Sequence, residues 1–91
     1  MTPADRELFR ICLLRILDAN DTRFGLGAEA CSTLVQRFGF NSPPDRAELE
    51  LEYLADDTRA LVTLTGKTIS KENRTWRITT QGRAFLDEHG Y

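Results

Sequence analysis

Residues 61–86 constrain the fold most, because the pattern of a strand pair is followed there by the start of a helix. Val62 and Leu64 alternate with threonines, which is the period of two expected of a half-buried strand. Ile69 and Trp76 are spaced to face each other as a cross-strand pair on either side of a polar turn. The segment therefore predicts a β-hairpin.

Local residues refine this prediction. The turn is expected at residues 71–74, where an asparagine can adopt a positive φ at low cost. The apolar residues before and after Gly66 are out of phase, so we expect one inserted residue, a β-bulge, at that glycine. Thr79 is expected to cap a last helix, whose Phe85 and Leu86 fold back on the hairpin.

Length and cysteine content limit what else the chain can do. Its 91 residues suffice for a single domain, residues 1–91, with one modest core. We expect neither a signal peptide nor a membrane span, and hence a cytoplasmic location, because charged residues interrupt every apolar run. Cys12 and Cys31 are expected to be buried free thiols, and His89 is the only histidine. We therefore expect no metal, no cofactor and no enzymatic activity.

The first predicted helix has Thr2 as its cap and Pro3 at its first position, and it runs to about Asn20. It has nearly two apolar faces, because Ile11 and Leu14 lie off the main stripe. One interpretation is that later segments wrap around both faces. We favour the other, a homodimer seam through Ile11 and Leu14, because so short a chain has little material to cover both faces.

Two further segments follow the first helix. Residues 20–27 predict a loop, from which Phe24 and Leu26 are expected to enter the core. A second helix is predicted over residues 28–38 from its apolar spacing, and Gly39 is expected to end it.

Ser42 is the expected cap of a third helix, which ends near Asp57. Its core face is predicted to carry Ala47, Leu51 and Leu54. Two short helices joined by a brief turn form a helix-turn-helix. The sequence thus predicts a mainly helical α+β domain of three helices, a β-hairpin and a short C-terminal helix.

Several stretches carry a family resemblance: LEYL at residues 51–54, LV at 61–62, WRITTQGRAFL at 76–86, and LLRIL at 13–17 through FGL at 24–26. Together they resemble the winged-helix superfamily, and in particular small bacterial or phage-encoded regulators of that class. The resemblance implies that the hairpin is a wing and the third helix a recognition helix. It implies fold more strongly than function.

The charge pattern at the hairpin favours DNA. Between residues 58 and 83 six cations accompany one acid, Glu72. We therefore interpret the chain as a regulator-like module that contacts the phosphates of double-stranded DNA, mainly through its wing. The alternative is that these side chains only protect an exposed strand from aggregation. The residues expected at DNA are Lys67, Lys71, Arg74 and Arg77 on the wing and Arg46 on the third helix.

The third helix argues against this function, because six acids accompany one base between residues 45 and 57. The competing hypothesis is a protein–protein interaction module. In it Leu49 and Tyr53, one turn apart and opposite the core face, dock a basic partner. The alternative is that the last helix covers both side chains. If the carboxylates form ion pairs with the lysines and arginines of the same molecule, neither proposed binding surface survives.

Overall fold

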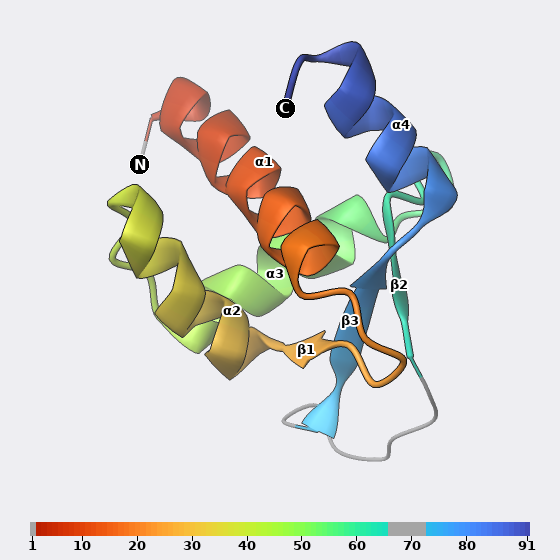
Figure 1. The fold of residues 1–91 in the computed structure, drawn as a ribbon. Coiled ribbons are helices and arrows are strands. Elements are labelled where there is room, and N and C mark those ends of the chain that lie inside the picture. Colours follow the sequence, from red (N-terminus) through yellow and green to blue (C-terminus); the bar gives the residue numbers. More distant parts are fainter. Residues whose placement is uncertain (1, 66–72) are drawn as a thin grey trace.

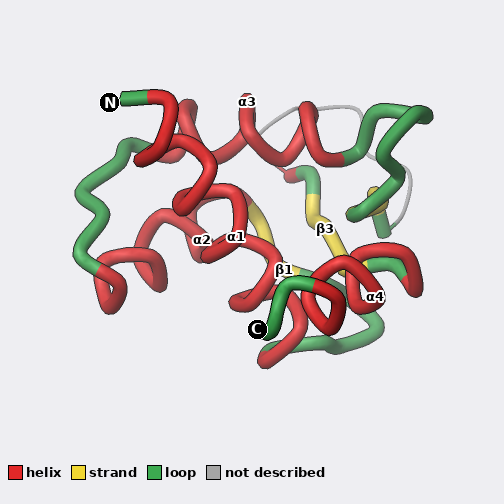
Figure 2. Tube along the Cα trace, turned by 90° about the horizontal axis from the view of Figure 1, so that it is seen from above, coloured by secondary structure: helices red, strands yellow, loops and turns green. Residues whose placement is uncertain are grey.

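The computed structural model describes residues 2–65 and 73–91, which form a mainly helical α+β fold, as predicted (Figure 1). Helix α1 packs against α3, α4, the 3₁₀ helix and the sheet. Seen from above, β3 lies between α3 and α4 (Figure 2). The elements in chain order are α1 (Pro3–Ala19), β1 (Leu26–Gly27), α2 (Ala28–Leu34), the 3₁₀ helix η1 (Val35–Phe38), α3 (Pro44–Leu54), β2 (Val62–Leu64), β3 (Thr75–Ile78) and α4 (Thr80–Glu88).

Helix α1 begins at the cap that the sequence predicts. Oγ1 of Thr2 accepts a hydrogen bond from the amide of Asp5 at 3.1 Å, and the Asp5 carboxylate accepts one from the amide of Thr2 at 3.4 Å. Pro3 lies in the first turn, where its missing N–H costs nothing. The buried side chains of this helix form the centre of the core: Phe9, Cys12, Leu13, Leu14, Ile16 and Leu17.

The three strands form an antiparallel sheet in the order β1-β3-β2. Trp76 of β3 is paired with Leu26 on one side and with Leu64 on the other. Val62 is paired with Ile78, and both are buried together with Trp76. The inner face of the sheet therefore belongs to the same core as α1.

Strand β1 was not predicted, because a strand of two residues is too short to show alternation. The predicted pair of Ile69 with Trp76 is wrong, since Leu26 and Leu64 occupy both sides of Trp76. Ile69 itself, Gly66 and the first half of the predicted turn lie outside the described residues.

The loop before β1 meets the sheet through its backbone. At Gly25, whose φ is +70°, a Cβ would lie 2.4 Å from the carbonyl oxygen of Trp76, so no side chain fits there. Oγ1 of Thr65 donates to the carbonyl oxygen of Phe24 at 2.9 Å. The Phe24 side chain is 72% exposed, and the prediction that it enters the core is wrong. Leu26 does pack against the core.

Helices α2 and η1 together cover the predicted residues 28–38, and Gly39 ends them with a φ of +88°. The prediction that Ser42 caps α3 is wrong. The capping residue is Pro43, and the cap has no side-chain hydrogen bond. Ser42 is instead buried, where its carbonyl oxygen accepts a hydrogen bond from the Ser32 hydroxyl and joins α2 to the start of α3.

The capping of α4 agrees with the prediction. Oγ1 of Thr79 accepts a hydrogen bond from the amide of Gly82 at 3.0 Å and donates one to the carbonyl oxygen of Ala60 at 2.6 Å. A Cβ on Gly82 would lie 2.3 Å from the carbonyl oxygen of Leu61, so α4 packs directly on the chain before β2. Leu86 is buried in the core, as expected of a helix that folds back.

The second apolar face of α1, which carries Ile11 and Leu14, is covered within the chain. Leu14 is 1% exposed, and Ile11 is half-buried. Phe85 of α4 and Leu61 lie with them around a common cavity. The prediction that Leu14 is exposed in a homodimer seam is therefore wrong. Leu61 and Phe85, which follow α3 in the chain, cover this face of α1, although so short a chain was not expected to cover it.

Candidate functional site

The outer face of α3 carries an exposed apolar pair. Ala47, Leu51 and Leu54 face the core and are buried, as predicted. On the opposite side Leu49 is 53% exposed and Tyr53 is 37% exposed. The alternative that the last helix buries both side chains is therefore wrong.

The ring of Tyr53 lies between two guanidinium groups. Cζ of Arg10, from α1, and Cζ of Arg59 each lie 3.5 Å from its centroid. Arg59 also donates through Nε to the backbone carbonyl oxygen of Tyr53 at 2.9 Å, which satisfies a carbonyl group in the last turn of α3. These contacts orient the ring, although the side chain remains partly exposed.

A cavity of about 350 Å³ lies beside this ring, between α1, the end of α3 and α4. Its volume falls near the lower end of the range of about 300–1,000 Å³ found for small-molecule sites. Ile11, Leu14 and Tyr53 all line it, although the sequence analysis assigned them to two separate surfaces. Leu49 is not among the residues that line it. The other lining residues are Glu7, Arg10, Leu54, Arg59, Leu61 and Phe85.

Sequence reasoning missed Arg10, Arg59 and Phe85 as members of this site. Arg10 precedes Ile11, so a helical projection of α1 could have placed it at the edge of the second apolar face. Arg59 and Phe85 give no such local signal. They reach the cavity only because the chain turns back after α3 and because α4 packs on α1.

The carboxylate of Glu50, on the inner side of α3, is fully buried in an ion-pair cluster. It accepts hydrogen bonds from Nε of Arg6 and from Nε of Arg10, both at 2.9 Å. Burial by itself would raise the pKa of Glu50, but the bonds from Arg10 and Arg6 outweigh it and hold the pKa below its ordinary value. This glutamate therefore joins α3 to α1.

A second glutamate of α3 faces the sheet. Glu48 is 4% exposed, and its carboxylate accepts a hydrogen bond from Nε1 of Trp76 at 3.3 Å. Arg74 was predicted to lie on a DNA-binding wing. Its Nη1 atom lies 3.5 Å from Oε1 of Glu48 and 2.9 Å from Oε1 of Glu52. The start of β3 is thus bound electrostatically to α3.

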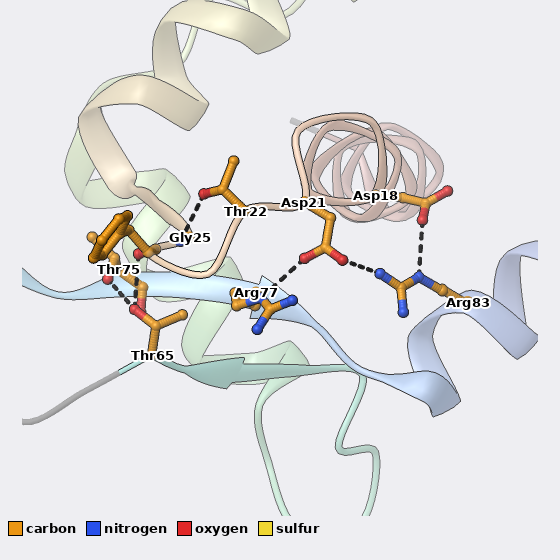
Figure 3. A network of polar contacts seen from close by, with 9 residues as sticks. Asp18, Asp21, Thr22, Gly25, Thr65, Thr75, Arg77 and Arg83 are labelled. Carbon is orange, nitrogen blue, oxygen red and sulfur yellow. Dashed lines mark hydrogen bonds and ion pairs between the residues drawn. The ribbon is translucent and has the colours of Figure 1, made fainter.

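Arg77 forms part of a third cluster, near the loop after α1 (Figure 3). Its Nε lies 3.0 Å from the Asp21 carboxylate, and Arg83 of α4 reaches the same carboxylate and that of Asp18. The hydrogen bond from Arg77 is the main reason why the pKa of Asp21 lies below its ordinary value. The cluster ties α4 and β3 to the end of α1.

The residues predicted to bind DNA do not form one exposed basic surface in the described part of the chain. Arg74 and Arg77 bind carboxylates, and Arg46 is half-buried on α3. Lys67 and Lys71 lie outside the described residues. Within the described residues, the three glutamates of α3 thus lie in ion pairs, Glu50 with arginines of α1 and Glu48 and Glu52 with Arg74. Asp45 of α3 remains exposed without an ion pair among residues 2–65 and 73–91.

The described residues offer little reactive chemistry. Cys12 and Cys31 are buried free thiols, and burial raises the pKa of Cys31 to about 12, so it is not poised as a nucleophile. Residues 2–65 and 73–91 contain no group of three potential metal ligands. Within the same residues no helix is both long enough and apolar enough to cross a membrane.

Comparisons with protein-family models, with curated proteins and with solved structures found no significant match to this chain.

Proposed function

We propose that this protein is a winged-helix interaction module whose third helix docks a protein partner. The order of three helices followed by a β-hairpin and a last helix supports the winged-helix scaffold that the sequence resemblance implies. The antiparallel sheet, in which a short strand before α2 pairs with the second strand of the hairpin, is consistent with it.

One observation carries the choice of a protein partner. Leu49 and Tyr53 are exposed on the outer face of α3, whereas the helix's central glutamates, Glu48 and Glu50, are buried against arginines and a tryptophan. Protein interfaces favour an apolar and aromatic centre with charges at the rim. The outer face of α3 has this composition, with Asp45 one turn before Leu49 as an exposed acid.

The exposed carboxylate of Asp45 beside Leu49 favours a partner that brings an apolar side chain with a cation next to it. The chain carries a net charge of −2, and Asp45 is an exposed carboxylate on the docking helix. A basic partner would be attracted at a distance and would bury Leu49 on contact. Tyr53, whose ring is oriented by Arg10 and Arg59, would lose little conformational freedom on binding.

DNA binding is the second candidate, and the order of elements favours it. Its weakness is electrostatic. Arg74 and Arg77 would have to exchange the carboxylates of Glu52 and Asp21 for phosphates, which replaces one ion pair by another instead of adding one. Such an exchange gains less free energy of DNA binding than new contacts from cations without ion pairs, which the sequence led us to expect on the wing.

A matched pair of leucine substitutions tests the proposal. Leu49 is 53% exposed on α3, and Leu64 is 44% exposed on β2, so Leu49→Asn and Leu64→Asn remove similar exposed side chains. A photo-reactive amino acid at position 49 identifies the partner by crosslinking. Calorimetry with the purified partner should then show at least a tenfold loss of affinity for Leu49→Asn and none for Leu64→Asn.

Both variants should unfold within about 0.5 kcal/mol of the wild type, because the two side chains lie on the surface. Equal affinity of the two variants for the partner would end the proposal. Duplex DNA titrated at low and at high salt provides the competing measurement. Micromolar, salt-dependent binding that Arg77→Gln weakens and Leu49→Asn leaves unchanged would favour the second candidate.

A further inference from the structure

The cavity beside Tyr53 has an apolar interior and a charged rim. Leu14 and Leu54 in its lining are almost fully buried, and Ile11, Leu61 and Phe85 are partly buried side chains packed against the core. These side chains come from α1, the end of α3, the segment before β2, and α4. Their apolar surface lies inside a cavity of about 350 Å³.

The rim brings three charged side chains to the cavity, and their partners differ. Arg10 is engaged by Glu50 at 2.9 Å and by Glu7 at 3.5 Å, so its charge is already balanced. Glu7 lies on the rim with a largely exposed side chain. Among residues 2–65 and 73–91, Arg59 has neutral partners only: Nε donates to the carbonyl oxygen of Tyr53 at 2.9 Å, and one terminal nitrogen donates to Oγ1 of Thr58 at 3.4 Å.

Asp56, three residues before Arg59, does not take up its charge. The Asp56 carboxylate accepts hydrogen bonds from the amide of Thr58 at 2.9 Å and from its hydroxyl at 2.7 Å. Arg59 helps to lower the pKa of Asp56 at longer range, after the two bonds from Thr58, but it forms no ion pair with it among the described residues. A guanidinium group offers five N–H donors, and the two hydrogen bonds of Arg59 leave donors for an anion.

We propose that this cavity binds a small amphipathic monocarboxylate, with its alkyl or aryl group among Ile11, Leu14 and Phe85 and its carboxylate on the guanidinium of Arg59. The apolar interior selects the hydrophobic part, and the charge of Arg59 selects an acid over a neutral or a basic head group. The cavity shares Tyr53 with the docking surface proposed above, but Leu49 does not line it, so binding of a small acid can be measured without a protein partner.

Octanoate, 1-octanol and octylamine are suitable probes, because they share one chain and differ in the head group. Titration of labelled protein, followed by NMR, should place octanoate at the cavity. The expected evidence is contacts from its chain protons to the methyl groups of Ile11, Leu14, Leu54 and Leu61. Octylamine should bind more weakly than octanoate, since Arg59 repels it.

Arg59→Met and Arg59→Lys provide a matched pair. Both lose the planar group that donates to the Tyr53 carbonyl, but only lysine keeps the charge. The ratio of octanoate to octanol affinity should fall about tenfold in Arg59→Met and less in Arg59→Lys. Binding of octanol itself should change little in either variant.

Two results would overturn the proposal. One is a ratio of octanoate to octanol affinity that stays the same in Arg59→Met as in the wild type. The other, which needs no variant, is octanoate that shifts residues outside the cavity or that leaves the spectrum of the wild-type protein unchanged. If the Arg59 variants fail to fold, Ile11→Trp, which fills the cavity, should abolish binding of octanoate and of octanol alike.

Discussion

Two of the arginine–carboxylate clusters described above have the same chemistry in different surroundings. In the first, the Glu50 side chain has no exposed surface, and Arg10 is 12% exposed. In the second, Asp21 is 19% exposed, and Arg83 and Asp18 are 46% and 47% exposed. The first joins α1 to α3 in the interior, and the second joins α1 to β3 and α4 at the surface (Figure 3).

This difference in exposure sets what each cluster contributes. A buried ion pair gains little over a well-packed apolar replacement, but loss of one partner leaves a charge without compensation in a poorly solvated place. A surface pair is screened by water and salt and stabilises by about 0.2–1 kcal/mol. The surface cluster bears more directly on function, because it pairs Arg77 with Asp21, whereas the sequence predicted that Arg77 contacts DNA phosphates.

The largest expected effect is at Glu50. Glu50→Ala should lower the free energy of unfolding by about 3–5 kcal/mol, because Arg10 would remain almost buried with only the exposed Glu7 carboxylate, at 3.5 Å, as its partner. Urea unfolding followed by the fluorescence of the single, buried Trp76 measures this. Glu50→Gln, which keeps a hydrogen-bond acceptor, should lose less. A loss below about 1 kcal/mol in Glu50→Ala would mean that the two clusters are equivalent.

Glu48 should show an intermediate effect. Glu48→Leu removes the acceptor of the Trp76 indole N–H, and an unsatisfied buried donor costs about 1–3 kcal/mol. The matched control is Glu48→Gln, whose amide oxygen can still accept that bond. Urea unfolding of both variants should rank Gln above Leu in stability. The reverse order would contradict a stabilising role for the hydrogen bond from the Trp76 indole.

The smallest effect is expected at Asp21, where Asp21→Asn should lower the free energy of unfolding by no more than about 1 kcal/mol. The Arg77 hydrogen bond holds the folded pKa of Asp21 below its ordinary value of 3.8. The stability that the ionised Asp21 contributes is therefore fully present above that pH. It is lost as the pH falls through the folded pKa.

Thermal unfolding over a pH series gives the corresponding measurement. The difference between the wild type and Asp21→Asn should be full at neutral pH and should close in acid below pH 3.8. Added salt should also shrink it, whereas the loss in Glu50→Ala should persist in salt because that cluster is buried. A difference at Asp21 that grows in acid would contradict the direction of its pKa shift.

The sequence was most informative where a structure depends on near neighbours. The cap of Thr2 on Asp5 and that of Thr79 on Gly82 each span three residues, and both are present. The core face of α3 likewise follows from helical periodicity alone. The exception is Ser42, whose carbonyl is held by Ser32 of α2, so that contact with another helix overrides a local preference.

The sequence by itself therefore determined the α+β class, most helix limits and the exposed position of Leu49, because these follow from hydrogen bonds and apolar spacing within a few residues. Only the tertiary structure decided which cation meets which carboxylate. Glu50 meets arginines 40 and 44 residues away, and Asp21 meets Arg77 56 residues away. An ion pair depends on distance in space, and a sum of charges along the chain does not contain that distance.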